Sequence, residues 1–320
     1  MPLFERPDKV ESPLYVLTSI YNPVRFRNRW KLYENFAKMV KQTEAILYTV
    51  EVAYGERKFV LPFPEPPHFL LQLRTDHEVW CKENALDLLS HRLPLDAKYL
   101  AWADADIIFV RPDWVGETLH QLQHYDIVQM FSQAIDLDSQ YHHLARFLGF
   151  VYCWKHQYPV AQPPPPYGCP PWHEPFTWHP GLAWAYKRKA WNNIGGLIDW
   201  MVLGGADYFA AAAYCEQERW YPEYLGEDGV GLLKQYRNRC DQYINGNVGC
   251  LDGTILHNWH GHKDHRSYED RGSILTAGIF HPQEDLKRDS QGLWQLEPHA
   301  KALRDGIRYY MRKRKEDNLE

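Results

Sequence analysis

The sequence contains no pair of cysteines at the spacing of a zinc ribbon or a redox motif. Six cysteines stand at positions 81, 153, 169, 215, 240 and 250, and the nearest two are 10 residues apart. A disulfide framework and a zinc ribbon are therefore disfavoured, and reduced thiols are expected. This pattern predicts a cytoplasmic protein.

The chain also lacks long apolar runs and an excess of basic charge. No apolar stretch approaches the roughly 18 residues that a membrane helix needs, and the first residues hold no apolar segment typical of a secretory signal. Lysine and arginine total 36 against 41 acidic residues, a formal charge of −5. This balance gives no general electrostatic reason for nucleic-acid binding, although local basic patches are compatible with it.

Aromatic side chains are abundant instead. They make up 15% of the 320 residues, with 13 Trp and 21 Tyr, and the chain also has 16 His. Flat rings that carry a polar group line clefts for sugars and bases, and they also fill ordinary cores. Composition alone leaves both uses open.

The first 130 residues alternate between predicted strands and predicted helices. Short apolar runs predict strands at Leu14–Ile20, Ile46–Tyr54, Phe69–Leu73, Tyr99–Ala103 and Asp126–Phe131. Helical spacing predicts helices between them, including one over His77–Ser90 and one that begins at Pro112. This order predicts an α/β fold with a doubly wound, mostly parallel sheet that has helices on both faces.

The later part of the chain changes in character. Eight prolines between Tyr158 and Pro175, including the run Pro163–Pro166, predict an extended surface loop. A further strand is predicted at Ile255–Trp259. Apolar spacing over residues 300–310 predicts a C-terminal helix, and the basic residues 312–315 at its end suit the helix dipole.

Two acids, Asp104 and Asp106, directly follow the predicted strand Tyr99–Ala103. Carboxylates at the carboxyl end of a strand lie where open α/β sheets bind ligands. The two charges would repel each other, and a divalent cation that prefers oxygen ligands, Mg²⁺ or Mn²⁺, removes that repulsion. The alternative is a pair of acids that cap the following turn.

Three histidines, His257, His260 and His262, stand within six residues after a short predicted strand. A neutral imidazole can complete the ligand shell begun by the aspartates, with His257 as the first candidate and His260 as the second. Three histidines also suit zinc, but the Asp pair and the lack of cysteine partners favour a harder metal.

A third signal is Gly204-Gly205-Ala206-Asp207. Adjacent glycines permit a sharp turn and the close approach of a ligand. The following aspartate can point into a cleft and act as a general base, or it can simply cap the predicted helix after it. The two roles are compatible.

At these residues the sequence resembles the GT-A fold glycosyltransferases, which bind a nucleotide sugar through a metal held by Asp-x-Asp and pass the sugar to an acceptor hydroxyl. The resemblance covers most of residues 14–262. Its most specific part, from Gly181 to Asp207, is similar to the β-1,4-galactosyltransferase pattern of a Gly-led strand, an Ile-Asn-Gly-Phe-like turn and a Gly-Gly-Glu-Asp motif. Ala206 replaces the Glu of that motif, which puts acceptor recognition in doubt.

The resemblance implies roles residue by residue. Asp207 falls on the catalytic base, which implies an inverting displacement, and Mn²⁺ or Mg²⁺ is implied between Asp104, Asp106 and His257 or His260. The implied partner is a nucleotide-sugar donor, first of all a UDP-sugar. The donor-binding candidates are Thr18, Ser19, Glu51, Lys82, Asn84, Asp104 and Ala105. Aromatic stacking separately suggests Trp178, Trp184 and Trp172 as acceptor-binding rings for a sugar or a base, with an ordinary core role as the alternative for each. Asp199 is a further acceptor-binding candidate.

The implied organisation is one GT-A domain over residues 1–265, with a nucleotide-sugar half at about 10–135 and an acceptor half at about 136–265. A C-terminal helical extension at 266–320 follows it. Blocks around Trp80, Asp106, His179 and His257 also look like phage and prophage glycosyltransferases. Some of these transfer sugars to hydroxymethylated bases in DNA, which makes 5-hydroxymethylcytosine in phage DNA a candidate acceptor beside glycans.

Two other classes of function remain open at this point. A nucleotidyltransferase on a similar sheet predicts a Gly-rich phosphate loop after the first strand, and residues 18–29 contain no glycine. A non-catalytic module would bind nucleic acid or carbohydrate through aromatic rings and the basic residues 312–315. Binding without metal dependence or turnover would favour that class.

Overall fold

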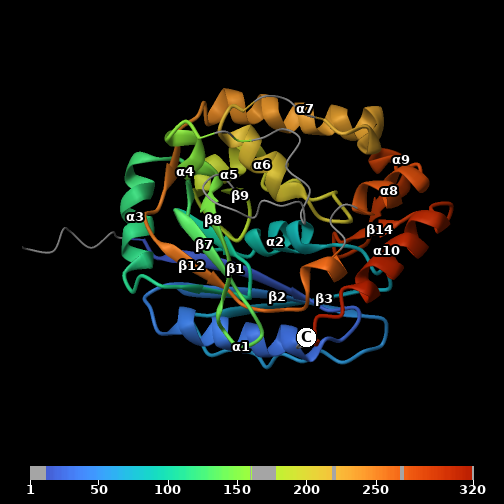
Figure 1. The fold of residues 1–320 in the computed structure, drawn as a ribbon, viewed down its shortest axis with the longest axis horizontal. Coiled ribbons are helices and arrows are strands. Elements are labelled where there is room, and N and C mark those ends of the chain that lie inside the picture. Colours follow the sequence, from blue (N-terminus) through green and yellow to red (C-terminus); the bar gives the residue numbers. More distant parts are fainter. Residues whose placement is uncertain (1–11, 159, 161–177, 218–220, 267–269, 319–320) are drawn as a thin grey trace, which may run out of the picture.

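The computed structural model describes residues 12–158, 160, 178–217, 221–266 and 270–318. A seven-stranded sheet forms its centre, in the strand order β11-β6-β10-β4-β1-β2-β3 (Figure 1). Its strands are β1 (Leu14–Tyr21), β2 (Ile46–Tyr54), β3 (Phe69–Thr75), β4 (Tyr99–Ala103), β6 (Ile127–Gln129), β10 (Ala183–Lys187) and β11 (Val248–Cys250). Four of the strand pairs are parallel, and only β10 runs antiparallel to its two neighbours. The predicted mostly parallel α/β sheet is confirmed.

Helices cover both faces of this sheet. On one face pack α1 (Arg27–Lys41) and α3 (Trp114–His124). The opposite face is covered by α2 (Lys82–Ser90), α5 (Arg188–Ile194), α6 (Ala206–Tyr214) and α7 (Gly226–Tyr243). In Figure 1, α1 runs along the lower side of the sheet and α7 along the upper side.

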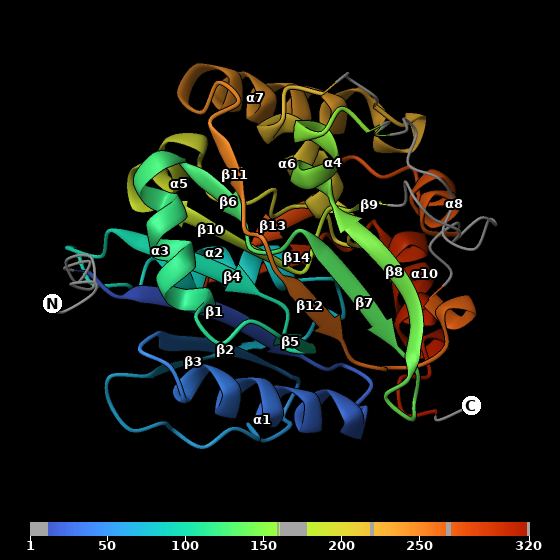
Figure 2. The same ribbon diagram turned by 60° about the vertical axis from the view of Figure 1, so that its left-hand side comes forward.

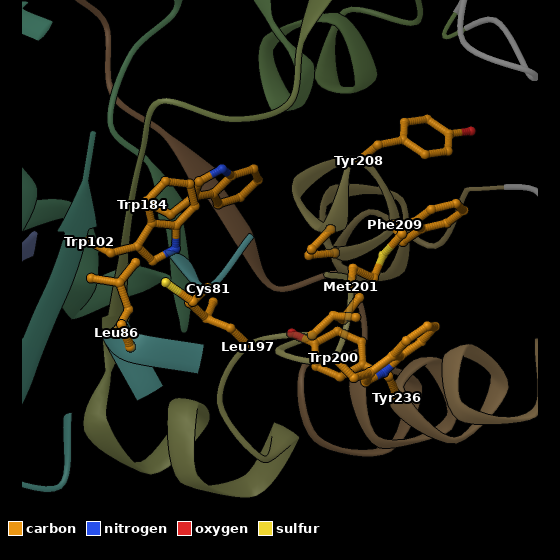
Figure 3. Close-up of a cluster of buried hydrophobic side chains, with 14 of the residues drawn as sticks. Cys81, Leu86, Trp102, Trp184, Leu197, Trp200, Met201, Tyr208, Phe209 and Tyr236 are labelled. Carbon is orange, nitrogen blue, oxygen red and sulfur yellow. The ribbon is translucent and has the colours of Figure 1, made fainter. Parts of the chain in front are cut away.

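Alternation along each strand divides the core into two layers. In β10, Trp184 and Tyr186 join the core under α2 and α5–α7, whereas Ala183 and Ala185 join the core under α1 and α3. Successive side chains of a strand point to opposite faces, and both faces are buried here, which explains the nearly continuous apolar runs. Trp184 is also the register partner of Trp102 on β4, and Figure 3 shows these two indoles close together.

A second, five-stranded sheet has the order β5-β12-β7-β8-β9 (Figure 2). It consists of β5 (Ile107–Phe109), β12 (Thr254–His257), β7 (Gln133–Leu137), β8 (His143–Gly149) and β9 (Trp178–His179). The sequence predicted only β12 among these strands. The short β5 begins immediately after Asp106, so this sheet connects the acidic turn to the histidine segment.

The C-terminal part contains α8 (Asp270–Ala277), α9 (Pro282–Asp285), a two-stranded sheet of β13 (Leu286–Arg288) and β14 (Trp294–Leu296), and α10 (Lys301–Lys313). The remaining elements are α4 (Phe150–Lys155) and the short 3-10 helices Glu223–Leu225 and Lys263–Arg266. Leu303 and Ile307 of α10 belong to the same core cluster as Leu86 of α2. The predicted division at residue 265 stays a prediction.

The predicted helix over His77–Ser90 is wrong in its first turn, because α2 begins only at Lys82. Tertiary contacts hold the preceding residues in another conformation. The Trp80 amide donates to the Val202 carbonyl at 2.8 Å, and the His77 ring accepts from the Leu296 amide. The Pro163–Pro166 run lies outside the described residues. Within the described part of the chain, no helix is long and apolar enough to cross a bilayer.

Candidate functional site

The turn that carries the two predicted acids is anchored on both sides. The Asp104 amide donates to the Leu182 carbonyl at 2.8 Å, and the Thr18 hydroxyl donates to the carbonyl of Ala103, the last residue of β4. Beyond the turn, Asn258 donates to the Asp106 carbonyl through both its amide and its side chain, at 2.8 and 3.0 Å. The turn is therefore held by β1, the start of β10 and the histidine segment at once.

The structure brings Asp106, His257 and His260 together. Each offers a ligand atom, and these atoms all lie within 4.8 Å of one another. His260 Nε2 lies 3.2 Å from Asp106 Oδ2, His257 Nε2 lies 3.7 Å from Asp106 Oδ1, and the two Nε2 atoms are 3.1 Å apart. We call these three side chains the acid–histidine cluster. Both imidazoles are buried, at 8% and 7% exposure, while Asp106 is half-buried.

Sheet register explains why the cluster forms. His257, the last residue of β12, pairs with Ile107 of β5 on one side and with Asp136 of β7 on the other. Ile107 directly follows Asp106, so the strand pairing places the imidazole beside that carboxylate. The antiparallel pairing of β12 with β5 thus brings residues 106 and 257 together, and no local pattern in the sequence predicts this pairing.

Asp136 holds the other side of the His257 ring. Its Oδ1 lies 2.7 Å from His257 Nδ1 and accepts that ring hydrogen, and the carboxylate is buried. Burial alone would lower the pKa of His257, but Asp106 and Asp136 raise it to about 10. Sequence reasoning missed Asp136, because it lies 121 residues from His257 and outside every motif.

Asp104 has a different partner from Asp106. Its Oδ1 accepts from Lys82 Nζ at 2.8 Å, and the same ammonium lies 4.5 Å from the centre of the Trp102 ring. Burial would lower the pKa of Lys82, but Asp104, Glu83 and Asp207 raise it well above its ordinary value, so the side chain stays charged. Lys82 and Asp104, both predicted, therefore form an ion pair next to the acid–histidine cluster.

Asp207 stands at the start of α6, after two glycines with left-handed φ of +82° and +93°. Its carboxylate lies over Gly181, where an added Cβ would come within 2.5 Å of Asp207 Oδ2. Asp207 is among the charges that shift the pKa values of Lys82, Glu83 and Asp104. The predicted base thus interacts electrostatically with the Lys82–Asp104 pair and with Glu83.

A further acid, Glu83, was not predicted. Its side chain is buried beside Lys82, and its Oε2 accepts from the Trp80 indole at 2.9 Å. Burial raises the pKa of Glu83 to about 7; Lys82 opposes that shift, and Asp207 adds to it. The only signal in the sequence was its position directly after Lys82.

The other predicted donor residues lie on β1 and β2 and in the acidic turn itself. Thr18 is fully buried and Ser19 half-buried at the end of β1, while Ala105 is half-buried between the two aspartates. Glu51 is buried and accepts from the Val60 and Leu61 amides and the Gln72 side chain. These contacts tie Glu51 to the segment before β3.

Asn84 and the predicted acceptor residue Asp199 fix the C-terminal hairpin. Asn84 Nδ2 donates to Asp199 Oδ2 at 3.3 Å and to the Gly292 carbonyl at 3.2 Å, and its Oδ1 accepts from the Trp294 amide. Asp199 also accepts from Arg288 Nη2 at 2.6 Å. The two side chains therefore contact each other and the hairpin rather than the acid–histidine cluster.

Both predicted acceptor-binding tryptophans that the structure describes are buried in the same core cluster. Trp184 is 1% exposed, and its indole donates to the Pro180 carbonyl, so it packs as a core side chain. Trp178 is 8% exposed and stacks on Tyr208, the residue after Asp207, at 5.6 Å between ring centres. Trp172 lies outside the described residues.

A hollow of about 400 Å³ follows the carboxyl ends of β2 and β3. Residues 54–57, Asp76 and Glu78 line it. Because β1 to β4 are parallel, this hollow opens on the same edge of the sheet as the acidic turn. Its lining shares no residue with the acid–histidine cluster.

The donor set of the acid–histidine cluster fits a divalent cation. One carboxylate and two imidazoles with converging atoms are a mixed oxygen and nitrogen donor set, which several divalent first-row metal ions accept. The Asp136–His257 contact is the arrangement that orients a metal-binding imidazole. Asp106, His257 and His260 are the residues that would hold the ion, with Asp104 adjacent.

Comparisons with known proteins find only distant similarity to solved structures. No protein-family model and no curated protein matches the chain. A putative nucleotide-diphospho-sugar transferase from Desulfovibrio desulfuricans G20 is similar over 93% of this chain and 97% of its own, with 13% identity and a TM-score of 0.32. A Drosophila β1,4-galactosyltransferase 7, solved with manganese, UDP-Gal and xylobiose, covers 80% of this chain and 74% of its own, with 10% identity and a TM-score of 0.35.

A 4-diphosphocytidyl-2C-methyl-D-erythritol synthase from Anaerococcus prevotii is similar over 76% of this chain and 89% of its own, with 9% identity and a TM-score of 0.32. These solved structures thus include both sugar transferases and a cytidylyl enzyme. Identities and TM-scores this low do not identify the activity of this chain.

Proposed function

We propose that this chain is a divalent-metal-dependent glycosyltransferase that moves a sugar from a nucleotide-sugar donor to an acceptor hydroxyl with inversion. The observation that carries the proposal is the acid–histidine cluster, formed by sheet register beside the Lys82–Asp104 ion pair. The position of Asp207, close enough to perturb those charges, supports it. The resemblance to β-1,4-galactosyltransferases makes a UDP-sugar the first donor to test.

The residues of the site have different roles in binding the donor. Asp106, His257 and His260 would hold the cation, and the Lys82–Asp104 ion pair adjoins these three residues. When bound, Mn²⁺ or Mg²⁺ supplies positive charge that stabilises the departing nucleoside diphosphate. The Lys82 ammonium, kept charged by its acidic neighbours, adds a second positive group near the phosphates.

Asp207 acts on the acceptor. The acceptor oxygen attacks the anomeric carbon from the face opposite the leaving group, so a new C–O bond forms as the bond to the diphosphate breaks. The hydroxyl proton passes to the Asp207 carboxylate. One displacement of this kind inverts the anomeric centre.

A panel of UDP-sugars tests the proposal, with nucleotide release as the readout and Mn²⁺ present. We expect release with at least one donor, loss of release with a chelator, and loss in the Asp106→Ala variant. Unchanged turnover in Asp106→Ala would refute the proposed role of the cluster. Exposed Asp113, which pairs with Arg111 after β5, provides the matched control Asp113→Ala.

The same assay separates the other classes of function. Pyrophosphate release from a nucleoside triphosphate and a sugar phosphate would indicate a nucleotidyltransferase. Tight ligand binding without metal dependence or turnover would indicate a binding module.

The acceptor is proposed as a hydroxyl on a glycan or on hydroxymethylated DNA, and salt distinguishes the two. If the acceptor is DNA containing 5-hydroxymethylcytosine, its binding weakens steeply with rising salt, because phosphate contacts release counterions. A small saccharide acceptor shows little salt dependence. Both acceptors are therefore included in the donor panel at two salt concentrations.

A further inference from the structure

The last turn of the described chain, residues 314–318, is here called the C-terminal turn, and it lies between α1 and the histidine segment. The Asp317 carboxylate accepts from the Arg27 and Asn28 amides at 3.0 and 2.9 Å, which caps the start of α1. On the other side, the Trp259 indole donates to the Asn318 carbonyl at 2.8 Å.

Glu316 is the buried centre of this turn. Its side chain is 0% exposed and forms ion pairs with Arg29 and Arg314, with Arg29 Nη2 to Glu316 Oε1 at 2.7 Å and Arg314 Nε to Oε1 at 2.6 Å. Arg29 also donates to the Tyr21 carbonyl at the end of β1. Burial alone would raise the pKa of Glu316, but Arg29 and Arg314, with a smaller contribution from His260, lower it below its ordinary value.

The turn packs directly against the residue after His260. Gly261 has a φ of +91°, and an added Cβ there would lie 3.0 Å from the Arg314 carbonyl, the Lys315 carbonyl and Glu316 Cα. The Asn28 side chain bridges the same two segments by donating to the Trp259 carbonyl at 2.8 Å and to the Glu316 carbonyl at 3.5 Å. Backbone contacts therefore surround His260 on its C-terminal side.

His257 and His260 are held by different parts of the fold. His257 ends β12 and is fixed by strand register and by Asp136. His260 lies three residues beyond the strand, in the segment that the C-terminal turn covers. We infer that Glu316 is a positioning residue for the metal site, because the C-terminal turn that it anchors holds His260 in place as a ligand. This inference rests on the proposed function of the acid–histidine cluster.

Mn²⁺ titration of the full chain, followed by electron paramagnetic resonance, tests the inference without relying on activity. In Glu316→Gln we expect Mn²⁺ affinity to fall by about tenfold, at the lower end of the effect of groups that orient metal ligands. In turnover assays the Mn²⁺ concentration for half-maximal rate should rise, while the rate at saturating Mn²⁺ returns close to that of the unaltered chain. Equal Mn²⁺ affinity in Glu316→Gln and the unaltered chain would overturn the inference.

Two further variants complete the design. Asp241→Asn removes a carboxylate that pairs with Arg237 at 2.6 Å on α7, and it should leave Mn²⁺ affinity unchanged. If circular dichroism shows that Glu316→Gln does not fold, Trp259→Phe is the deciding variant, since it removes the indole hydrogen bond to Asn318 and keeps an aromatic ring beside His262. Weaker Mn²⁺ binding in Trp259→Phe supports the inference, and unchanged binding overturns it. If the unaltered chain binds no Mn²⁺, the proposed function itself fails, which is a different outcome.

Discussion

His257 donates its Nδ1 hydrogen to Asp136 at 2.7 Å, which directs the opposite ring nitrogen toward Asp106. The contact joins β12 and β7, which lie side by side in the second sheet. A carboxylate behind a metal-binding imidazole fixes the ring orientation and increases its basicity. The pairing of β12 with β7 therefore fixes the orientation of His257.

Replacing Asp136 by Asn should weaken Mn²⁺ binding by about ten- to hundredfold, because the imidazole loses its charged partner. Isothermal titration of Mn²⁺ into the full chain measures the change. Asp138→Asn is the matched control, since Asp138 lies on the same hairpin and pairs with exposed His142. Equal losses in both variants would show that the effect is not specific to His257.

Removing the Lys82 ammonium should lower turnover. Lys82→Met keeps most of the apolar stem over Trp102 but leaves Asp104 without its cation. We expect kcat/KM for the nucleotide sugar to fall by about 100-fold, the usual loss when a charge-stabilising group is removed from a site. Steady-state kinetics at saturating Mn²⁺ measure it, and an unchanged kcat/KM would contradict the role assigned to Lys82.

Asp207→Asn keeps the size of the side chain and removes its ability to accept a proton. We expect kcat to fall by about 100-fold or more, with the affinity for UDP and Mn²⁺ unchanged, because a base acts on the acceptor and not on the donor. Nucleotide release and UDP titration measure the two quantities. Equal loss of donor affinity would indicate instead that Asp207 binds the donor.

The stability of the ligand-free protein should depend on Glu83 between about pH 4 and pH 7. An unfolded glutamate has a pKa of about 4.3, whereas burial raises the pKa of Glu83 in the folded chain to about 7. The folded state therefore binds the proton more tightly, and this group makes stability fall as pH rises through that window. Glu83→Gln cannot ionise, so it should gain stability relative to the unaltered chain between pH 5 and pH 8.

Urea unfolding at the two pH values measures this gain. Glu44→Gln, at an exposed position after α1, is the matched control and should not change the pH profile. If Glu83→Gln and the unaltered chain lose stability equally from pH 5 to pH 8, Glu83 is not protonated in the folded state at the lower pH.

The parts of the fold that local patterns encode were predictable from the sequence. Buried parallel strands are continuous apolar runs, so β1, β2 and β4 were found close to their bounds. The turn at Asp104–Asp106 and the two candidate histidines followed from their position after strands. The first turn of the helix predicted at His77 was wrong because Trp80 and His77 bond to residues more than 100 positions away.

The rest of the site depends on contacts between residues far apart in the chain, which no local sequence pattern predicts. Asp136 reaches His257 only through the pairing of β7 with β12, and Glu316 reaches the His260 segment only after the C-terminal turn docks. The sequence predicts for the basic residues 312–315 only a favourable interaction with the dipole of the C-terminal helix. Arg314 is instead buried and paired with Glu316, and Arg312 pairs with Glu78.

The most direct test of the central claim is anomalous diffraction at the manganese edge from crystals of the full chain soaked with Mn²⁺ and UDP. We predict one strong peak among Asp106 and the Nε2 atoms of His257 and His260, with the UDP phosphates beside it. A peak elsewhere, or none at the acid–histidine cluster while UDP is bound, would contradict the claim that these three residues form the metal site of a sugar transferase.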